Sequence, residues 1–92
     1  MEKILTKHPA GKSGRNIDRE KYDVMKKLIV RCLKENEMTF TEISNSANKK
    51  LKGKFKGSIP WYLETVKLDL EMRKVIQRIP KTRPQKYRLV KK

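Results

Sequence analysis

The sequence has 92 residues and a formal net charge of +15, with an isoelectric point near 10.2. This length is sufficient for one domain with a modest core and too short for two. Such an excess of lysine and arginine predicts a polyanionic partner, with nucleic acid favoured over a membrane surface. The alternative is that the lysines serve only solubility.

The cysteine and hydropathy patterns predict a cytoplasmic protein. The single cysteine, Cys32, excludes an internal disulfide framework and fits a reducing compartment. Its apolar neighbours predict a buried thiol rather than a reactive one. No apolar run reaches the ~20 residues that span a bilayer, and residues 1–7 lack the continuous apolar segment of a secretory signal.

The beginning of the chain is expected to form a basic, flexible arm over residues 1–16. This segment carries Pro9, Gly11 and Gly14 among several cations, and such a composition gives weak signals for order. The folded domain is then expected to span residues 17–92.

A first helix is predicted to start near Ile17 or Asp18. Asp18 and Glu20 place negative charge at the positive end of the helix dipole, and Asn36 and Glu37 end the helix. Its apolar residues recur at helical spacing on one face: Tyr22, Met25, Leu28, Ile29, Cys32 and Leu33.

Residues 38–40 suit a minimal strand, and a second helix is predicted to follow it to about Lys50. Thr39 and Glu42 have the spacing of a capping box at the start of this helix. Three apolar residues at intervals of four are expected to face inward: Ile43, Ala47 and Leu51. A lysine-rich turn with two glycines, residues 52–57, leads to the next helix.

The third predicted helix, residues 58–73, organises the rest of the chain. Ser58 is a good N-cap because its hydroxyl can accept a first-turn N–H, and Pro60 fits the first turn. The core-facing stripe comprises Ile59, Leu63, Val66 and Leu70, with Tyr62 alongside. Residues 74–90 predict a β-hairpin that turns at Lys81 to Arg83 and packs Tyr87 into the core with Ile43.

The order of helix, short strand, helix, turn, helix and hairpin over residues 17–90 resembles the winged helix-turn-helix superfamily. This resemblance implies an α+β fold with three helices, a short strand and a C-terminal β-hairpin wing. A narrower resemblance is to a small bacterial family known only as a domain of unknown function. It rests on the run Trp61–Arg73, with its WYxxTVKLDLE core, on His8–Lys12 and on the pair Lys21–Tyr22. The family implies no catalytic residues.

One position departs from this pattern, because Lys74 stands where such proteins have glycine. Either this lysine takes the left-handed cap geometry at some cost in energy, or the helix ends differently.

No constellation of residues supports catalysis, so an enzyme is not expected, and neither is a cofactor. His8 has no carboxylate partner placed by pattern, and one cysteine with one distant histidine cannot hold a metal. Residues 10–13 resemble part of a P-loop, but Thr6 stands where the motif needs its first glycine.

Three acidic residues of the third helix raise the question of an acidic metal site. Each is spaced three or four residues from a cation, which predicts solvated helix pairs instead. The pairs are Glu64–Lys67, Lys67–Glu71 and Asp69–Arg73.

The predicted nucleic-acid contacts surround the third helix. Its outer face is nearly neutral and carries carboxylates, which repel phosphate, so backbone contacts are favoured over base readout. The contact residues are five lysines before the helix, its N-cap and four cations of the hairpin: Lys49, Lys50, Lys52, Lys54, Lys56, Ser58, Lys81, Arg83, Lys86 and Arg88.

A second apolar stripe, Trp61, Leu68 and Met72, lies opposite the core-facing one on the third helix. Either the hairpin or the N-terminal arm covers it, or it binds a second copy or a protein partner. A third hypothesis for Trp61 is that it stacks on a nucleic-acid base.

The sequence therefore predicts a winged-helix protein that binds nucleic acid, with double-stranded DNA favoured and transcriptional regulation as a role. The alternative is a protein-interaction or dimerisation module.

Overall fold

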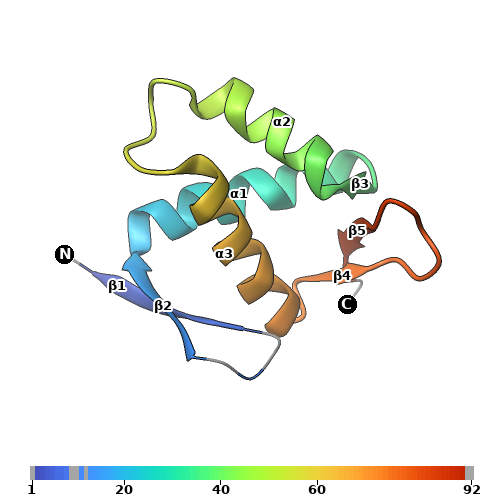
Figure 1. Ribbon diagram of the computed structural model, residues 1–92, viewed down its shortest axis with the longest axis horizontal. Helices are drawn as coiled ribbons and strands as arrows, with labels where there is room; N and C mark the ends of the chain where they lie inside the picture. Colours follow the sequence, from blue (N-terminus) through green and yellow to red (C-terminus); the bar gives the residue numbers. More distant parts are fainter. Residues whose placement is uncertain (1, 9–10, 12, 91–92) are drawn as a thin grey trace.

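The computed structural model describes residues 2–8, 11 and 13–90, and these form three helices and two small antiparallel sheets (Figure 1). The elements in chain order are β1 (Lys3–Lys7), β2 (Ser13–Asp18), α1 (Arg19–Glu35), β3 (Met38–Thr39), α2 (Phe40–Leu51), α3 (Ile59–Met72), β4 (Ile76–Arg78) and β5 (Lys86–Leu89). The fold is α+β, as predicted, and its helices and C-terminal hairpin are compatible with a winged-helix-like arrangement.

Each helix begins where the sequence predicts, because a polar side chain caps it. Asp18 accepts a first-turn backbone N–H of α1 at 3.1 Å. The capping box of α2 is complete, with Thr39 Oγ1 accepting the N–H of Glu42 and the Glu42 carboxylate accepting the N–H of Thr39. Ser58 Oγ accepts the N–H of Trp61 at 3.2 Å. These bonds satisfy N–H groups that have no partner within the helix, so local sequence sets the helix starts.

One hydrophobic core joins the helices to the C-terminal sheet. The predicted core residues Ile43, Leu63, Val66, Leu70 and Tyr87 belong to a single buried cluster, which confirms that prediction. The first helix contributes the apolar face expected of it: Tyr22, Met25, Leu28, Ile29, Cys32 and Leu33. Burying a large apolar side chain stabilises the folded state by about 1.5–3 kcal/mol, so this cluster fixes the packing of the helices.

The end of α3 adopts the left-handed cap geometry, one of the two alternatives that the sequence leaves open at Lys74, whose φ is +60°. The N–H of Lys74 donates to the carbonyl of Glu71 at 3.1 Å, and that of Val75 donates to the carbonyl of Leu70 at 2.9 Å. This pair of bonds is the Schellman motif, which ends a helix abruptly and turns the chain away from its axis. The chain is thereby directed into the C-terminal sheet, in which β5 lies between β3 and β4.

The N-terminal arm differs from the prediction, because β1 and β2 form an antiparallel hairpin. Ile4 pairs with Ile17, which is buried in the core, so the boundary expected between residues 16 and 17 falls inside β2. The strands are short and polar and pair across an irregularity after Leu5, which gives no apolar alternation for a sequence pattern to detect. Residues 1, 9–10 and 12 of the predicted arm lie outside the described residues.

Figure 1 shows that the two basic segments lie at opposite ends of α3. The turn of residues 52–57 precedes the helix, and the loop between β4 and β5 lies beyond its C-terminal end. The β1–β2 hairpin packs on a further side, where it contacts α1 and α3. Since a helix of 14 residues is about 21 Å long, the two basic segments are well separated.

Candidate functional site

The first candidate surface is the lysine turn, residues 52–57 together with Lys49 and Lys50 at the end of α2. All five of its lysines are exposed. The backbone N–H groups of Lys54 and Phe55 both donate to the carbonyl of Leu51, at 2.9 and 3.1 Å, and this closes the turn. The Phe55 ring packs edge-to-face on Tyr62 at 5.3 Å, so the turn is held against the start of α3.

The second candidate surface is the C-terminal hairpin, where Lys81, Arg83, Lys86 and Arg88 are exposed. Thr82 organises its loop, because its hydroxyl donates to the carbonyl of Ile79 at 2.8 Å and accepts the backbone N–H of Lys86 at 2.9 Å. Lys86 and Arg88 flank the buried Tyr87 along β5, and the alternation of a strand directs both away from the core.

These two surfaces belong to acid-free stretches of the sequence. Residues 43–63 carry five lysines and no acidic residue, and residues 73–92 carry nine cations and no acidic residue. Together they account for 14 charges of the net +15. The four ion pairs among the described residues involve Arg19, Lys67, Arg73 and Arg78, of which only Arg73 and Arg78 lie in these stretches. The nine cations predicted to contact nucleic acid are therefore outside these ion pairs.

Lys86 is less available for a phosphate contact than most of these nine cations, because the Glu42 carboxylate lies near it. The pKa of Glu42 is lowered, first by the backbone N–H of Thr39, then by the Thr39 side chain, and also by the charge of Lys86. Arg88 also has acidic neighbours, because it lines one surface pocket together with Glu35 and Glu37.

The outer face of α3 bears no cation. The one basic residue between Ile59 and Met72 is Lys67, and it is buried. Trp61 and Met72, at 42% and 41% exposure, are among the most exposed large apolar side chains. A helix with this face offers a poor surface for reading bases in a major groove, where arginine, lysine, asparagine and glutamine make the specific contacts.

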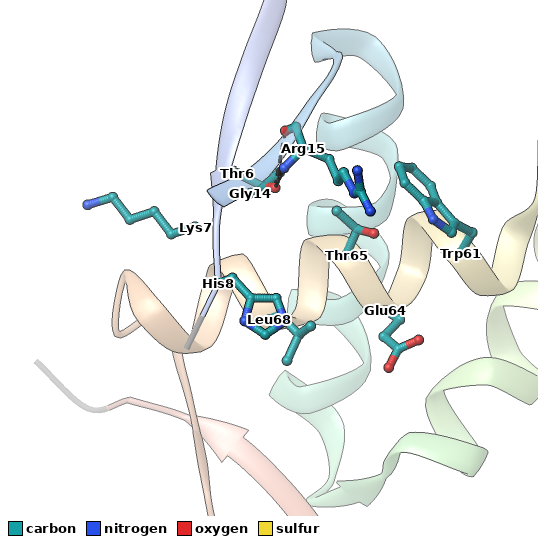
Figure 2. A pocket seen from close by; sticks show the side chains of 9 residues that line it. All are labelled: Thr6, Lys7, His8, Gly14, Arg15, Trp61, Glu64, Thr65 and Leu68. Atoms are coloured by element: carbon teal, nitrogen blue, oxygen red, sulfur yellow. Dashed lines mark hydrogen bonds between the residues drawn. The ribbon is translucent and has the colours of Figure 1, made fainter. Parts of the chain in front are cut away.

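A groove runs between this face and the β1–β2 hairpin (Figure 2). It encloses about 360 Å³ and is lined by Thr6, Lys7, His8, Gly14, Arg15, Trp61, Glu64, Thr65 and Leu68. Two of the three residues of the predicted interaction stripe, Trp61 and Leu68, thus line one groove, and Met72 does not. The N-terminal hairpin covers part of the stripe. Intramolecular cover by the N-terminal arm is one of the alternatives that the sequence leaves open.

Asp69 holds the hairpin in place. Its carboxylate is fully buried and accepts the backbone N–H of Lys7 at 2.7 Å, the hydroxyl of Tyr22, and Arg73 Nε at 2.8–3.0 Å. The predicted pair Asp69–Arg73 exists, but its carboxylate is not solvated as expected. Asp69 lies between the two apolar stripes of α3, and the core on one side and the N-terminal hairpin on the other exclude water from it. The position of Asp69 between two apolar stripes was the one feature of the sequence that could have predicted a buried carboxylate.

The predicted pair Lys67–Glu71 is also present and is buried rather than solvated. Lys67 Nζ lies 3.4 Å from Glu71 Oε2, donates to Tyr87 Oη at 3.1 Å, and faces the Phe40 and Tyr87 rings. Glu71 also pairs with Arg78 of β4 at 2.7 Å. These contacts hold α3 against the C-terminal hairpin formed by β4 and β5. Glu64 takes part in none of the ion pairs in the described part of the chain, so its predicted pairing with Lys67 is absent there.

Three narrower features of the described residues concern metal ligands, the cysteine and membrane spans. No group of three or more histidine, cysteine, aspartate or glutamate side chains is placed to hold a metal in that part of the chain. Cys32 is buried, as predicted. Each helix of the same residues is too short or too polar to cross a membrane.

The fold and these surfaces define a class: a small, strongly basic α+β domain with two exposed cationic surfaces and a groove beside its third helix. Residues 3–87 match the model of the Family of unknown function (DUF6958), and the chain belongs to this family. The match agrees with the resemblance to a domain of unknown function that the Trp61–Arg73 run indicates. Comparison with curated proteins and with solved structures gives no match.

Proposed function

We propose that this protein binds nucleic acid, with double-stranded DNA favoured, through contacts to the phosphate backbone. The observation that carries the proposal is the presence of nine exposed cations in two acid-free segments that flank α3, all nine outside the ion pairs formed among the described residues. Unpaired surface lysines and arginines displace counterions from phosphates, and this displacement supplies most of the affinity of sequence-independent binding.

The arrangement supports backbone contacts rather than base readout. The lysine turn at one end of α3 and the hairpin at the other would contact phosphates on either side of the helix. The face between them presents Trp61, Glu64 and Met72, which make no bidentate hydrogen bonds to guanine or adenine edges. Weak sequence specificity follows from this distribution, as does strong dependence on salt.

A protein-interaction module on the same scaffold is the second candidate, and the exposure of Trp61 and Met72 favours it. Sedimentation of the free protein separates the two. If this face binds a second copy, the parent is a dimer and Met72→Lys is a folded monomer.

The salt dependence of duplex binding tests the proposal. With about five phosphates neutralised, log affinity against log salt should have a slope of about −4 to −5. Replacing Lys52, Lys54 and Lys56 together with glutamine should weaken binding to all duplexes about equally and reduce the magnitude of the slope by about 3. Fluorescence anisotropy of a labelled duplex measures both quantities.

A matched variant controls for total charge. Glutamine at Lys3, Lys26 and Lys34 removes the same three charges from exposed positions outside both candidate surfaces. This control should retain most of the affinity. Equal weakening by the two triple variants would contradict the proposed surface, and no binding at low salt would contradict the function.

A further inference from the structure

The groove beside α3 combines an exposed aromatic ring with a cation outside the ion pairs. Figure 2 shows Arg15 extending from β2 toward Trp61 and Thr65, while Glu64 points the opposite way. Arg15 takes part in none of the ion pairs among the described residues. Lys7 lines the groove, but its side chain extends away from the other residues drawn. The polar character of the groove near the indole is therefore set by Arg15.

The backbone of Arg15 and the ring of Trp61 are both held in place before any ligand binds. The backbone N–H of Arg15 donates to Thr6 Oγ1 at 2.8 Å, and the same hydroxyl donates to the Arg15 carbonyl at 3.1 Å. The Trp61 ring meets Tyr62 edge-to-face at 4.8 Å, so Tyr62 supports the indole without stacking parallel on it. Because Tyr62 also packs on Phe55, the groove is joined to the lysine turn.

An aromatic face beside a guanidinium matches the chemistry of a nucleotide. Any base can stack on an aromatic ring, and an arginine binds phosphate through two parallel N–H donors. The volume of about 360 Å³ lies at the lower end of the range for ligand pockets, about 300–1,000 Å³. A duplex keeps its bases stacked and paired, so it presents no base to a groove unless one is flipped out.

We infer that this groove binds one unpaired nucleotide of a single-stranded nucleic acid, with the base against Trp61 and a phosphate at Arg15. The inference rests on the proposed function, because the lysine turn next to Trp61 would contact the neighbouring phosphates. It adds a preference for single strands that a surface of lysines alone does not provide.

Trp61 is the only tryptophan in the chain, so its fluorescence reports on the groove alone. Titration with a mixed-sequence single strand of about 12 nucleotides, within the usual range of site sizes, should quench this fluorescence. The duplex of the same sequence should bind, as measured by anisotropy of an end label, and leave the tryptophan emission nearly unchanged.

Variants at Trp61 give the affinity test. Trp61→Ala should weaken single-strand binding by about 5- to 150-fold, the range for loss of one stacked base, and leave duplex affinity unchanged. Trp61→Phe retains a ring and should restore most of the affinity. Met72→Ala is the matched control, because Met72 is equally exposed on α3 but outside the groove. Circular dichroism verifies that each variant is folded.

The outcomes separate this inference from the proposed function. Equal quenching by both forms, or a single-strand affinity of Trp61→Ala within about threefold of the parent, overturns the inference and leaves duplex binding standing. The same holds if Trp61→Ala weakens both forms alike. Absence of binding to either form at low salt overturns both proposals.

Discussion

At the scale of single residues, one carboxylate connects three parts of the fold. Asp69 accepts hydrogen bonds from the start of α1 through Tyr22, from β1 through the Lys7 backbone, and from Arg73 at the end of its own helix. A buried charge destabilises the folded state unless donors surround it, and these three provide that compensation. Asp69 therefore bonds the N-terminal hairpin to α3, in addition to the contacts that Ile17 of β2 makes in the core.

The contact between Tyr22 and Asp69 also makes the folding stability decrease at alkaline pH. Burial, followed by the hydrogen bond to Asp69, raises the pKa of Tyr22 well above its ordinary value of about 10. Below that value the phenol is protonated in both states and its contribution is complete. Above it the unfolded chain loses the proton while the folded chain keeps it, so stability falls by up to about 1.4 kcal/mol per pH unit.

Tyr22→Phe should therefore weaken the decline in unfolding free energy above about pH 10, while costing about 1 kcal/mol at neutral pH through the lost hydrogen bond. Urea unfolding of both proteins across this range measures the two slopes. Lysine titration affects the parent and the variant alike, so it cancels in the comparison. Identical slopes would show that the folded phenol ionises normally.

At the scale of elements, the N-terminal hairpin depends on close backbone approach at Gly14. A Cβ built there would lie 1.6 Å from the carbonyl oxygen of Thr6, an impossible separation from an atom of the opposing strand. The strands must therefore separate if any side chain is added. Because the Thr6 hydroxyl bonds both backbone groups of Arg15 at this point, their separation also breaks those hydrogen bonds.

Gly14→Ala should therefore destabilise the protein by more than about 2 kcal/mol, since it separates the strands and leaves buried polar groups without partners. Gly11→Ala is the matched control, because Gly11 has positive φ but nothing within 4 Å of an added Cβ. It should cost only about 1 kcal/mol, the usual penalty for a left-handed alanine. Thermal unfolding of the two variants measures both losses of stability. Equal losses would contradict the close approach of Gly14 to the Thr6 carbonyl.

At the scale of the whole molecule, net charge opposes compaction. The nine candidate contact cations take part in none of the ion pairs among the described residues, so they repel one another across the folded surface. A bound polyanion would relieve that repulsion. Such relief links the charge distribution to the proposed function, because a ligand that binds only the folded state stabilises it.

Added salt should consequently stabilise the free protein. Raising sodium chloride from about 0.01 M to about 1 M shortens the Debye length from about 30 Å to about 3 Å and screens the repulsion. We expect the thermal unfolding midpoint, measured by calorimetry, to rise. The variant with glutamine at Lys52, Lys54 and Lys56 should respond less. A midpoint that falls with salt would mean that the ion pairs dominate the electrostatic free energy.

Local sequence was sufficient for much of the fold. The caps at Thr39 and Ser58 and the core of the helices follow from short-range hydrogen bonding and apolar periodicity. These signals need no knowledge of distant residues, because each partner lies within one helical turn or recurs at a fixed spacing. The candidate cations were also evident, since charge is a property of composition.

Only the tertiary structure decided the role of the N-terminal segment and the state of Asp69. Residues 3–7 form a strand by pairing with β2, and Asp69, more than 60 positions away, fixes that hairpin against α3 by accepting the N–H of Lys7. Spacing within a helix identifies the Asp69–Arg73 pair but cannot say whether another element covers it. Burial depends on what packs against a surface. The groove at Trp61 likewise exists because a hairpin from the other end of the chain forms its second wall.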